Sequence, residues 1–439
     1  MYVQILRWKE ITEAVKHRLL SRSESDIEDS LEKVRPILQE VQARGDEALR
    51  KFIHDFDQVD LKNLPLRVSF EEFRKAEASL PNSVKDALHF AIQNVWKFHE
   101  TQKPASFSWV EVRPGIYAGE KGIPLPSVGL YVPRGRGSFP SMLYMMAVPA
   151  RIAGVPEIRI VTPPDPDGFV DAACLYAAEQ VGVTEVYRVG GAQAIGALAY
   201  GTESIRKVAK ILGPGSRYVA AAKRLVSDRV DTGLPAGPSE SIIIADRSAD
   251  PRLVALDLLI EAEHGSDSAA LLVTPDISLA EEVKKLLGLW ADQLPEPRRT
   301  FVQDVFSRYG GIVLTESLDE AVQVVNQFAP EHLQLQVSSP LDLLGKIQHA
   351  GEILLGSTTP FSVANYAVGA NAVLPTGGKA CTYSAVSVRD FLKYSSVIHV
   401  SPQGFSILQD PVQILAEYEG FPAHARALKY RTESGSYKE

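Results

Sequence analysis

A carboxylate and an imidazole stand three residues apart in the segment IEAEHGSDS. Glu261 and His264 lie in a stretch with helical periodicity, so both side chains are expected to leave the same face of the helix. Such a pair can bind one metal ion, since both groups are common zinc ligands. It can equally be a solvated glutamate beside a histidine that interacts with the C-terminal helix dipole.

Two other segments join an acidic residue to a histidine. In NQFAPEHLQLQV, Glu331 and His332 are adjacent, between a helical stretch and an alternating apolar strand. A loop at a strand edge is where α/β enzymes place catalytic acids and bases, although the pair can also be exposed and inert. In EYEGFPAHARALKYR, Glu419 and His424 flank a helix break, which can also be a simple helix start.

Glycine-rich turns follow three predicted strands, as PRGRG at 133–137, VGGAQ at 189–193 and LGPGS at 212–216. Parallel α/β proteins usually bind ligands at the carboxyl ends of strands, and such turns can bring backbone N–H groups to a pyrophosphate. The dinucleotide fingerprint GxGxxG is absent, and each turn alone can be a plain tight turn. Three of them close together favour a nucleotide.

Short β-branched runs alternate with helical segments through most of the chain. Runs at 128–133, 157–164 and 185–191 are each followed by a helical segment, which predicts parallel βαβ units. The pattern resumes after PAGPSE at 235–240, the expected crossing point between two such units. Before them, residues 23–57 predict one long helix, interrupted near Pro36 or Gly45.

These patterns predict an α/β fold with two Rossmann-like, doubly wound parallel-sheet domains, an N-terminal helical segment and a C-terminal helical arm. The predicted boundaries are 1–25 for the N-terminal segment, 26–128 with 240–380 for the first α/β domain, 129–239 for the second, and 381–439 for the arm. An appended helical arm needs a surface on which to pack, often that of a partner subunit.

Composition narrows the classes of ligand. The 439 residues include 46 Lys and Arg against 54 Asp and Glu, a net charge of −8, with no basic stripe for a nucleic acid. Cys174 and Cys381 are too few for a disulfide framework or a cysteine-built zinc site, so a metal would need His and carboxylate ligands. No signal-like or membrane-length apolar stretch occurs, which predicts a cytoplasmic protein that does not bind membranes.

Nine segments in a fixed order resemble one family. They are LYVPRG, VGGAQAIGALAYGTES, ILGPGSRYV, AGPSE, LLIEAEHGSDS, NQFAPEHL, VLPTGG, SVRDFLK and EYEGFPAHA. Together they resemble histidinol dehydrogenase over nearly the whole chain. The resemblance implies a homodimer of two Rossmann-like domains with an intertwined C-terminal arm, one zinc ion per active site, and NAD as oxidant. It also implies oxidation of an amino alcohol to an aldehyde and then to a carboxylate, with two NAD in turn.

The resemblance assigns roles to individual residues. Glu331 matches the residue that activates water, and His332 matches its acid/base partner, which suits an imidazole that exchanges protons near neutral pH. The remaining matches are the zinc ligands His264 and, from the other subunit, His424; the substrate contacts Ser239 and Glu419; and the cofactor contacts Tyr131 and Gln193.

Four positions depart from the family pattern. Glu261 stands for a zinc-binding Gln and Asn365 for a zinc-binding Asp, so the carboxylate is exchanged between two ligand positions. We predict that a metal site with redistributed charge survives, because these oxygen donors still suit zinc. Ser216 replaces a cofactor-contacting Asn and keeps a hydroxyl donor. Ala372 replaces a His in the substrate region and removes a partner suited to imidazole recognition.

The departures lead to three hypotheses about function. Arg134 and Arg136 stand where the family usually has small or neutral residues, and guanidinium groups favour anions. They can bind an anionic substrate, pair with the cofactor pyrophosphate, or be surface charges. The first hypothesis is a zinc- and NAD-dependent dehydrogenase of a small polar alcohol other than histidinol, such as an anionic diol, since family members that oxidise a dihydroxypropane sulfonate offer an analogy. The alternatives are histidinol dehydrogenase itself and a ligand-binding paralogue without catalysis.

Overall fold

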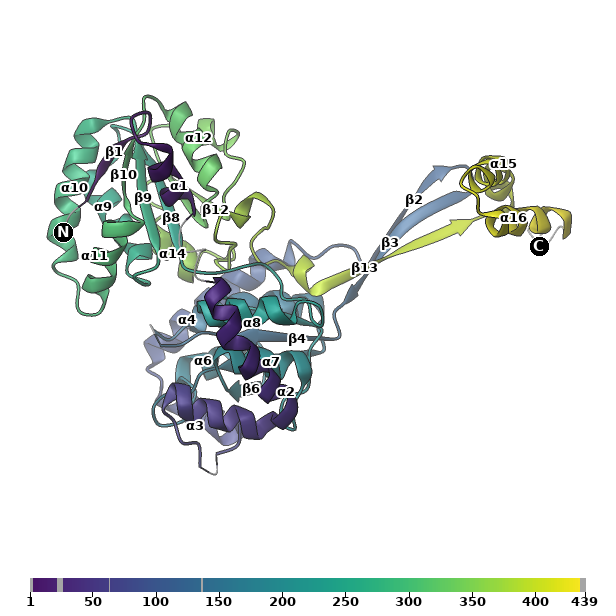
Figure 1. The fold of residues 1–439 in the computed structure, drawn as a ribbon, viewed down its shortest axis with the longest axis horizontal. Coiled ribbons are helices and arrows are strands. Elements are labelled where there is room, and N and C mark those ends of the chain that lie inside the picture. The colour runs from purple at the N-terminus through teal and green to yellow at the C-terminus, as the bar shows by residue number, and fades with distance from the viewer. Residues whose placement is uncertain (1–2, 22–26, 63, 136, 435–439) are drawn as a thin grey trace. The chain divides into compact units, whose positions relative to one another are not determined.

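The computed structural model describes residues 3–21, 27–62, 64–135 and 137–434 (Figure 1). The chain divides into two compact units. The first contains Met1–Gln102 and Leu125–Phe391, and the second contains Lys103–Pro124 and Leu392–Glu439. No helix in the described ranges combines the length and the apolar character needed to cross a membrane.

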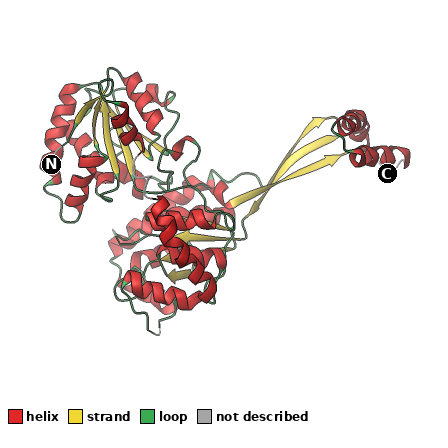
Figure 2. Ribbon diagram, in the orientation of Figure 1, coloured by secondary structure: helices red, strands yellow, loops and turns green. Residues whose placement is uncertain are grey.

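A six-stranded parallel sheet forms one part of the first unit (Figure 2). Its strands, in spatial order, are β1 (Ile5–Arg7), β10 (Gly311–Leu314), β9 (Ala269–Thr274), β8 (Glu240–Ala245), β11 (His332–Gln336) and β12 (Glu352–Leu355). From β10 to β12 this is the order of a doubly wound sheet, which grows outward in both directions from β8. Strands β8 and β9 are largely apolar on both faces, as expected where helices cover both sides, whereas β11 places buried Gln334 and Gln336 on one face.

Helices cover both faces of this sheet. One face carries α9 (Pro251–Ala262), α10 (Ile277–Ala291), α11 (Arg298–Arg308) and α14 (Phe361–Tyr366). The other carries α1 (Glu13–Ser21), α12 (Leu318–Phe328) and α13 (Pro340–Leu344). Alternate residues of β8 serve the two layers, since Ile243 packs in the first and Ile242 in the second.

A four-stranded parallel sheet forms the rest of the first unit. Its spatial order is β6 (Glu185–Arg188), β5 (Glu157–Thr162), β4 (Ser127–Tyr131) and β7 (Lys210–Leu212). One layer of helices consists of α2 (Ile27–Asp57), α7 (Gly191–Tyr200) and α8 (Arg217–Val226). Further helices pack as α3 (Phe70–Ser79) on α6 (Ala172–Gln180) and α4 (Asn82–Glu100) on α5 (Pro140–Ala153). The predicted α/β class with parallel sheets is therefore confirmed.

The N-terminal residues pack differently from the predicted grouping. Helix α2 buries Val34, Leu38 and Val41 in the core of the four-stranded sheet, whereas the prediction joined residues 26–128 to 240–380. The periodicity identifies an apolar helix face but not the sheet that covers it. Likewise, the segment predicted as 1–25 supplies β1, which pairs with β10 at the edge of the six-stranded sheet.

The predicted interruption of the long helix falls at Gly45. This residue has φ 51° and ψ −126°, so two helical pieces meet there, while Pro36 lies inside the first piece. Positive φ suits glycine, and a Cβ at this position would also collide with the carboxylate of Glu203.

The second unit is a three-stranded antiparallel sheet followed by two helices (Figure 1). Strand β3 (Ile116–Pro124) lies between β2 (Phe107–Arg113) and β13 (Leu392–Val400), and α15 (Pro402–Tyr418) packs on α16 (Pro422–Ser434). The predicted C-terminal helical arm is present as α15 and α16, and the structure differs from the predicted 381–439 segment in two respects. The arm contains strands, and residues up to Phe391, with the short helices η2 (Lys379–Cys381) and η3 (Val388–Phe391), belong to the first unit.

Candidate active site

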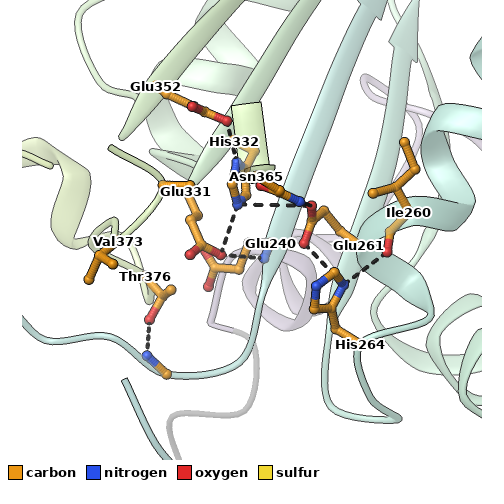
Figure 3. A network of polar contacts seen from close by, with 12 residues as sticks. Glu240, Ile260, Glu261, His264, Glu331, His332, Glu352, Asn365, Val373 and Thr376 are labelled. Atoms are coloured by element: carbon orange, nitrogen blue, oxygen red, sulfur yellow. Dashed lines mark hydrogen bonds and ion pairs between the residues drawn. The ribbon is translucent and has the colours of Figure 1, made fainter. Parts of the chain in front are cut away.

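Four glutamates and two histidines gather at one edge of the six-stranded sheet (Figure 3). Glu240, His332 and Glu352 are the first residues of β8, β11 and β12, and Glu331 immediately precedes β11. Because these strands are parallel, their first residues meet at the same edge. This is the amino edge of the sheet, whereas ligands of parallel sheets were expected at the carboxyl edge. Helix α9 ends beside it and contributes Glu261.

His332 lies among three carboxylates and is 3% exposed. Its Nδ1 is 2.5 Å from Oε1 of Glu352, and its Nε2 is 3.7 Å from Oε2 of Glu331 and 4.0 Å from Oε1 of Glu261. Burial alone would lower the pKa of His332, but the charges of Glu261, Glu331 and Glu352 outweigh it and raise the pKa to about 10. The three carboxylates therefore favour the protonated form of the imidazole.

Glu331 is the second member of the predicted acid/base pair. Its Oε2 accepts a hydrogen bond of 2.9 Å from the backbone N–H of Glu240. Burial, reinforced by the charges of Glu261 and Glu240, raises the pKa of Glu331 well above its usual range, against the opposing effect of His332. A buried carboxyl with a raised pKa beside an imidazole is typical of sites that transfer protons. The pair is thus buried, unlike the exposed loop pair that the sequence also allowed.

Glu261 and His264 are neighbours, as their spacing predicts. Oε2 of Glu261 is 3.4 Å from Nδ1 of His264, and Oε1 accepts a hydrogen bond of 2.8 Å from Nδ2 of Asn365. Although burial raises the pKa of Glu261, the histidines His264 and His332 and the hydrogen bonds from Asn365 and Ser239 lower it overall. Glu261 therefore carries a buried negative charge next to an imidazole and an amide.

This charge and its neighbours fit a divalent cation. His264 Nδ1 lies 2.9 Å from the carbonyl oxygen of Ile260, an arrangement that favours Nε2 as the ring nitrogen that binds a metal. Asn365 adds an amide oxygen to the donor set. In the described ranges no three His, Cys, Asp or Glu residues group as a metal site, so Glu261, His264 and Asn365 form an incomplete set within one chain.

The predicted cofactor contacts lie at the carboxyl edge of the four-stranded sheet. Tyr131 ends β4, Gln193 lies in the first turn of α7 after β6, and Ser216 is the N-cap of α8 after β7. Strands β4 and β7 flank the point where the strand order reverses, the usual position of a nucleotide in such sheets. The three residues thus share one edge, as the glycine-rich turns predict.

Two features of this edge fit a polar ligand. The hydroxyl of Tyr131 accepts a hydrogen bond of 3.1 Å from the backbone N–H of Gly191, and burial raises the pKa of this tyrosine to about 12. The side-chain oxygen of Gln193 is buried and accepts no hydrogen bond from the described residues. A buried amide oxygen without a donor is costly, and a bound ligand with N–H or O–H groups would satisfy it.

The predicted substrate contacts come from both units. Ser239 hydrogen-bonds to Glu261 and so belongs to the cluster at β8. Arg134 follows β4, with Nη1 4.0 Å from Oδ2 of Asp165, and Arg136 lies outside the described residues. Glu419 is the C-cap of α15 in the second unit, where its side chain is exposed.

Two remaining positions complete the predicted set. His424 belongs to α16 in the second unit, where it is exposed and its ring packs against Phe421 with centroids 5.3 Å apart. Ala372 is partly buried, and its backbone N–H lies 3.3 Å from the sulfur of Met145.

Sequence reasoning missed Glu240 and Glu352. Glu240 ends the AGPSE segment without having been assigned a role, Glu352 belongs to no motif, and each is a single acidic residue at the start of an apolar run. The available signal is positional, since both begin strands that flank β11 in the sheet. This positional signal can be used only after the order of the strands in the sheet is known.

The structure is an α/β fold with a buried Glu–His pair at one sheet edge, an arrangement suited to proton transfer. A sequence model described as "Histidinol dehydrogenase" matches residues 20–432. The chain belongs to the histidinol dehydrogenase family, as the ordered motifs predict.

Similar proteins cover nearly the whole chain. A histidinol dehydrogenase from Synechocystis sp. is 50% identical over 428 residues, 98% of this chain and 99% of the relative. A histidinol dehydrogenase homolog from Rhizobium meliloti is 48% identical over 427 residues, 97% of this chain and 94% of the relative. The crystal structure of histidinol dehydrogenase from Elizabethkingia anophelis matches with a TM-score of 0.93 at 33% identity, covering 99% of each chain.

Proposed function

We propose that this protein is a zinc- and NAD-dependent dehydrogenase that oxidises a small polar alcohol through an aldehyde to a carboxylate, using two NAD. The observation that carries the proposal is the buried pair of Glu331 and His332, 3.7 Å apart, beside the donor groups of Glu261 and His264. Family membership supports a dehydrogenase, and this cluster supplies the groups that its two oxidation steps need.

His332 and Glu331 divide the proton transfers between them. In the first step, Nε2 of His332 takes the proton of the substrate hydroxyl; a zinc ion at the neighbouring donor groups would lower the proton affinity of the substrate hydroxyl and of this imidazole. In the second step, Oε2 of Glu331 takes a proton from the water that adds to the aldehyde, while His332 returns its proton to the aldehyde oxygen. His332 then accepts a hydroxyl proton of the hydrate as the second hydride leaves. The neighbouring N–H of Glu240 holds Oε2 of Glu331 in place throughout.

The cofactors bind at two different edges in this proposal. Glu261, His264 and Asn365 hold zinc together with the partner subunit's His424, and Tyr131, Gln193 and Ser216 hold NAD. When bound, zinc polarises the substrate oxygen and NAD accepts the hydride. The orphaned oxygen of Gln193 supports the second assignment, because the carboxamide N–H groups and ribose hydroxyls of NAD are hydrogen-bond donors.

The second unit supports a homodimer in which Glu419 and His424 act on the partner subunit. Its helices and strands expose large apolar side chains, including Tyr418 at 90%, Ile398 at 72% and Tyr430 at 68% exposure. Exposed apolar surface of this kind marks an interaction site. Light scattering on the full chain tests the proposal, and a monomer at micromolar concentration would contradict it.

The substrate that we propose is an anionic diol rather than histidinol. Ala372 offers a methyl group where imidazole recognition would need a hydrogen-bonding partner. Nη1 of Arg134 lies 4.0 Å from Oδ2 of Asp165, a separation too long for a bidentate pair between this guanidinium and this carboxylate. NAD reduction should be assayed with L-histidinol and with short diols bearing a sulfonate, phosphate or carboxylate. Efficient turnover of histidinol, with none of the panel oxidised, would reject this substrate class.

L-Histidinol itself is the second candidate. It is favoured by the 50% identity to a protein named histidinol dehydrogenase over nearly all of both chains. Complementation of a histidine auxotroph separates the two candidates. A ligand-binding paralogue without catalysis is a third possibility; zinc analysis and NAD titration of the purified protein test it, since it predicts that neither binds.

A further inference from the structure

We propose that Glu352 is a positioning residue that holds the His332 ring in the orientation needed for proton transfer. The inference rests on the proposed acid/base role of His332. Oε1 of Glu352 lies 2.5 Å from Nδ1 of His332, and the two side chains are 11% and 4% exposed. Of the three carboxylates around the ring, Glu352 alone is within hydrogen-bond distance, since those of Glu331 and Glu261 are 3.7 and 4.0 Å from Nε2.

The register of two parallel strands produces this contact. His332 on β11 and Glu352 on β12 are directly paired, so their side chains leave the same face of the sheet side by side (Figure 3). The backbone fixes the pairing, because the N–H of Glu352 donates 3.0 Å to the carbonyl of Glu331 and that of Gly351 donates 2.9 Å to Pro330. The carboxylate of Glu352 therefore contacts the His332 ring from a regular strand, so no mobile loop has to become ordered.

The other neighbour of the His332 ring does not determine which way the ring is turned, so this orientation depends on Glu352. Phe361 packs edge-on against the imidazole, with ring centroids 5.8 Å apart and an interplanar angle of 68°, which limits tilting but does not distinguish the two nitrogens. A carboxylate accepts only, so it requires a proton on Nδ1 and leaves Nε2 to exchange protons with the substrate. This is the role that a carboxylate plays beside a histidine base in hydrolase triads.

Two substitutions at Glu352 distinguish its effect on the orientation of the His332 ring from the effect of its negative charge. Glu352→Ala removes the acceptor, whereas Glu352→Gln keeps an oxygen that can accept from Nδ1–H without the negative charge. Gln348→Ala is the matched control, because it truncates an exposed side chain in the same connection to β12. We expect Glu352→Ala to lower kcat on the order of 10- to 100-fold with KM changed less than about twofold, and Glu352→Gln to recover a large part of kcat.

A readout that does not depend on activity distinguishes this inference from the proposed function. In the full chain labelled with ¹⁵N-histidine, a hydrogen bond of this length should give a far-downfield proton resonance on Nδ1 of His332, identified by its loss in His332→Gln. The resonance should disappear in Glu352→Ala, shift upfield in Glu352→Gln and stay unchanged in Gln348→Ala.

The possible outcomes distinguish failure of the positioning role of Glu352 from failure of the proposed function. Persistence of the resonance in Glu352→Ala, or a rise in KM with unchanged kcat, would overturn the positioning role. If Glu352→Ala does not fold, an unshifted resonance in Glu352→Gln overturns it instead. If no alcohol is oxidised but the resonance behaves as expected, the proposed function fails while the orientation of His332 by Glu352 stands.

Discussion

Nδ2 of Asn365 donates a hydrogen bond of 2.8 Å to Oε1 of Glu261, so two of the residues that we propose as zinc ligands are in direct contact. Relative to the pattern that the family resemblance implies, the exchange keeps one carboxylate in this pair while moving it from helix α14 to helix α9. The two positions are therefore expected to be energetically coupled.

The coupling predicts the behaviour of three variants. Glu261→Gln leaves the pair without a carboxylate and should weaken zinc binding on the order of 10- to 100-fold. The double variant Glu261→Gln with Asn365→Asp returns the charge and should recover most of the affinity. Competition with a chromophoric chelator measures this, with Glu263→Gln at the same helix end as control. A double variant no tighter than Glu261→Gln would refute the coupling.

Glu331→Gln should abolish most of the activity without unfolding the protein. The amide can still accept the hydrogen bond from the N–H of Glu240, but it cannot take a proton from water, so kcat should fall by about 10² to 10⁴ with a small change in KM. Steady-state NADH formation measures both constants. Glu320→Gln, on the first turn of α12, is the control, and a variant with wild-type kcat would remove Glu331 from the mechanism.

Ala372→His should shift substrate preference toward L-histidinol. The new imidazole would restore a hydrogen-bonding side chain at a partly buried position, and a matched polar contact is worth on the order of tenfold or more in kcat/KM. The ratio of kcat/KM for histidinol to that for the best anionic diol should rise by that factor. An unchanged ratio, with the fold intact by circular dichroism, would show that position 372 does not contact the substrate.

Asp257 should make the protein less stable as the pH rises from about 4 to 6. Burial raises its pKa to about 6, only partly opposed by hydrogen bonds of 2.9 and 2.8 Å from Gln334 and Gln336. An unfolded aspartate releases its proton near pH 3.9, so between these values the folded state binds more protons. The neutral form stabilises the fold below this window, and up to about 3 kcal/mol of that stability is lost as the pH rises through it.

Asp257→Asn removes this titration and keeps an oxygen for both amide donors. Its thermal midpoint should therefore exceed that of the wild type at pH 7, and the difference should shrink toward pH 4. Asp292→Asn, on the exposed end of α10, should show no such difference. A wild-type midpoint that rises over this range relative to Asp257→Asn would contradict the assignment.

The sequence predicts those parts of the site that lie close together in the chain. Glu261 and His264 are one helical turn apart, and Glu331 and His332 are adjacent, so local spacing is sufficient to pair them. The contact between His332 and Glu352 depends on the register of β11 against β12 and was not predicted. Hydrophobic periodicity identifies strands but not their neighbours.

The same limit explains the errors in the fold. The apolar face of α2 is evident from sequence, yet the core that covers it lies on α7 and α8, more than a hundred residues away. Strand β13 pairs with β3, although the segment Leu125–Phe391 separates the two strands in the sequence. No local sequence pattern connects them. The architecture of the second unit therefore depends on the pairing of strands that are far apart in the sequence.

The pairing of β3 with β13 also constrains how the chain is made. Strand β3 leaves the ribosome long before Leu392–Val400, because all of Leu125–Phe391 is synthesised in between. At about 5–20 residues per second the β2–β3 hairpin must wait for tens of seconds, and an isolated two-stranded hairpin is marginally stable at best. During that time its outer edge and the apolar side chains of Trp109, Val110 and Val112 are open to other nascent chains. Chaperone capture of residues 107–124 during translation is the expected consequence.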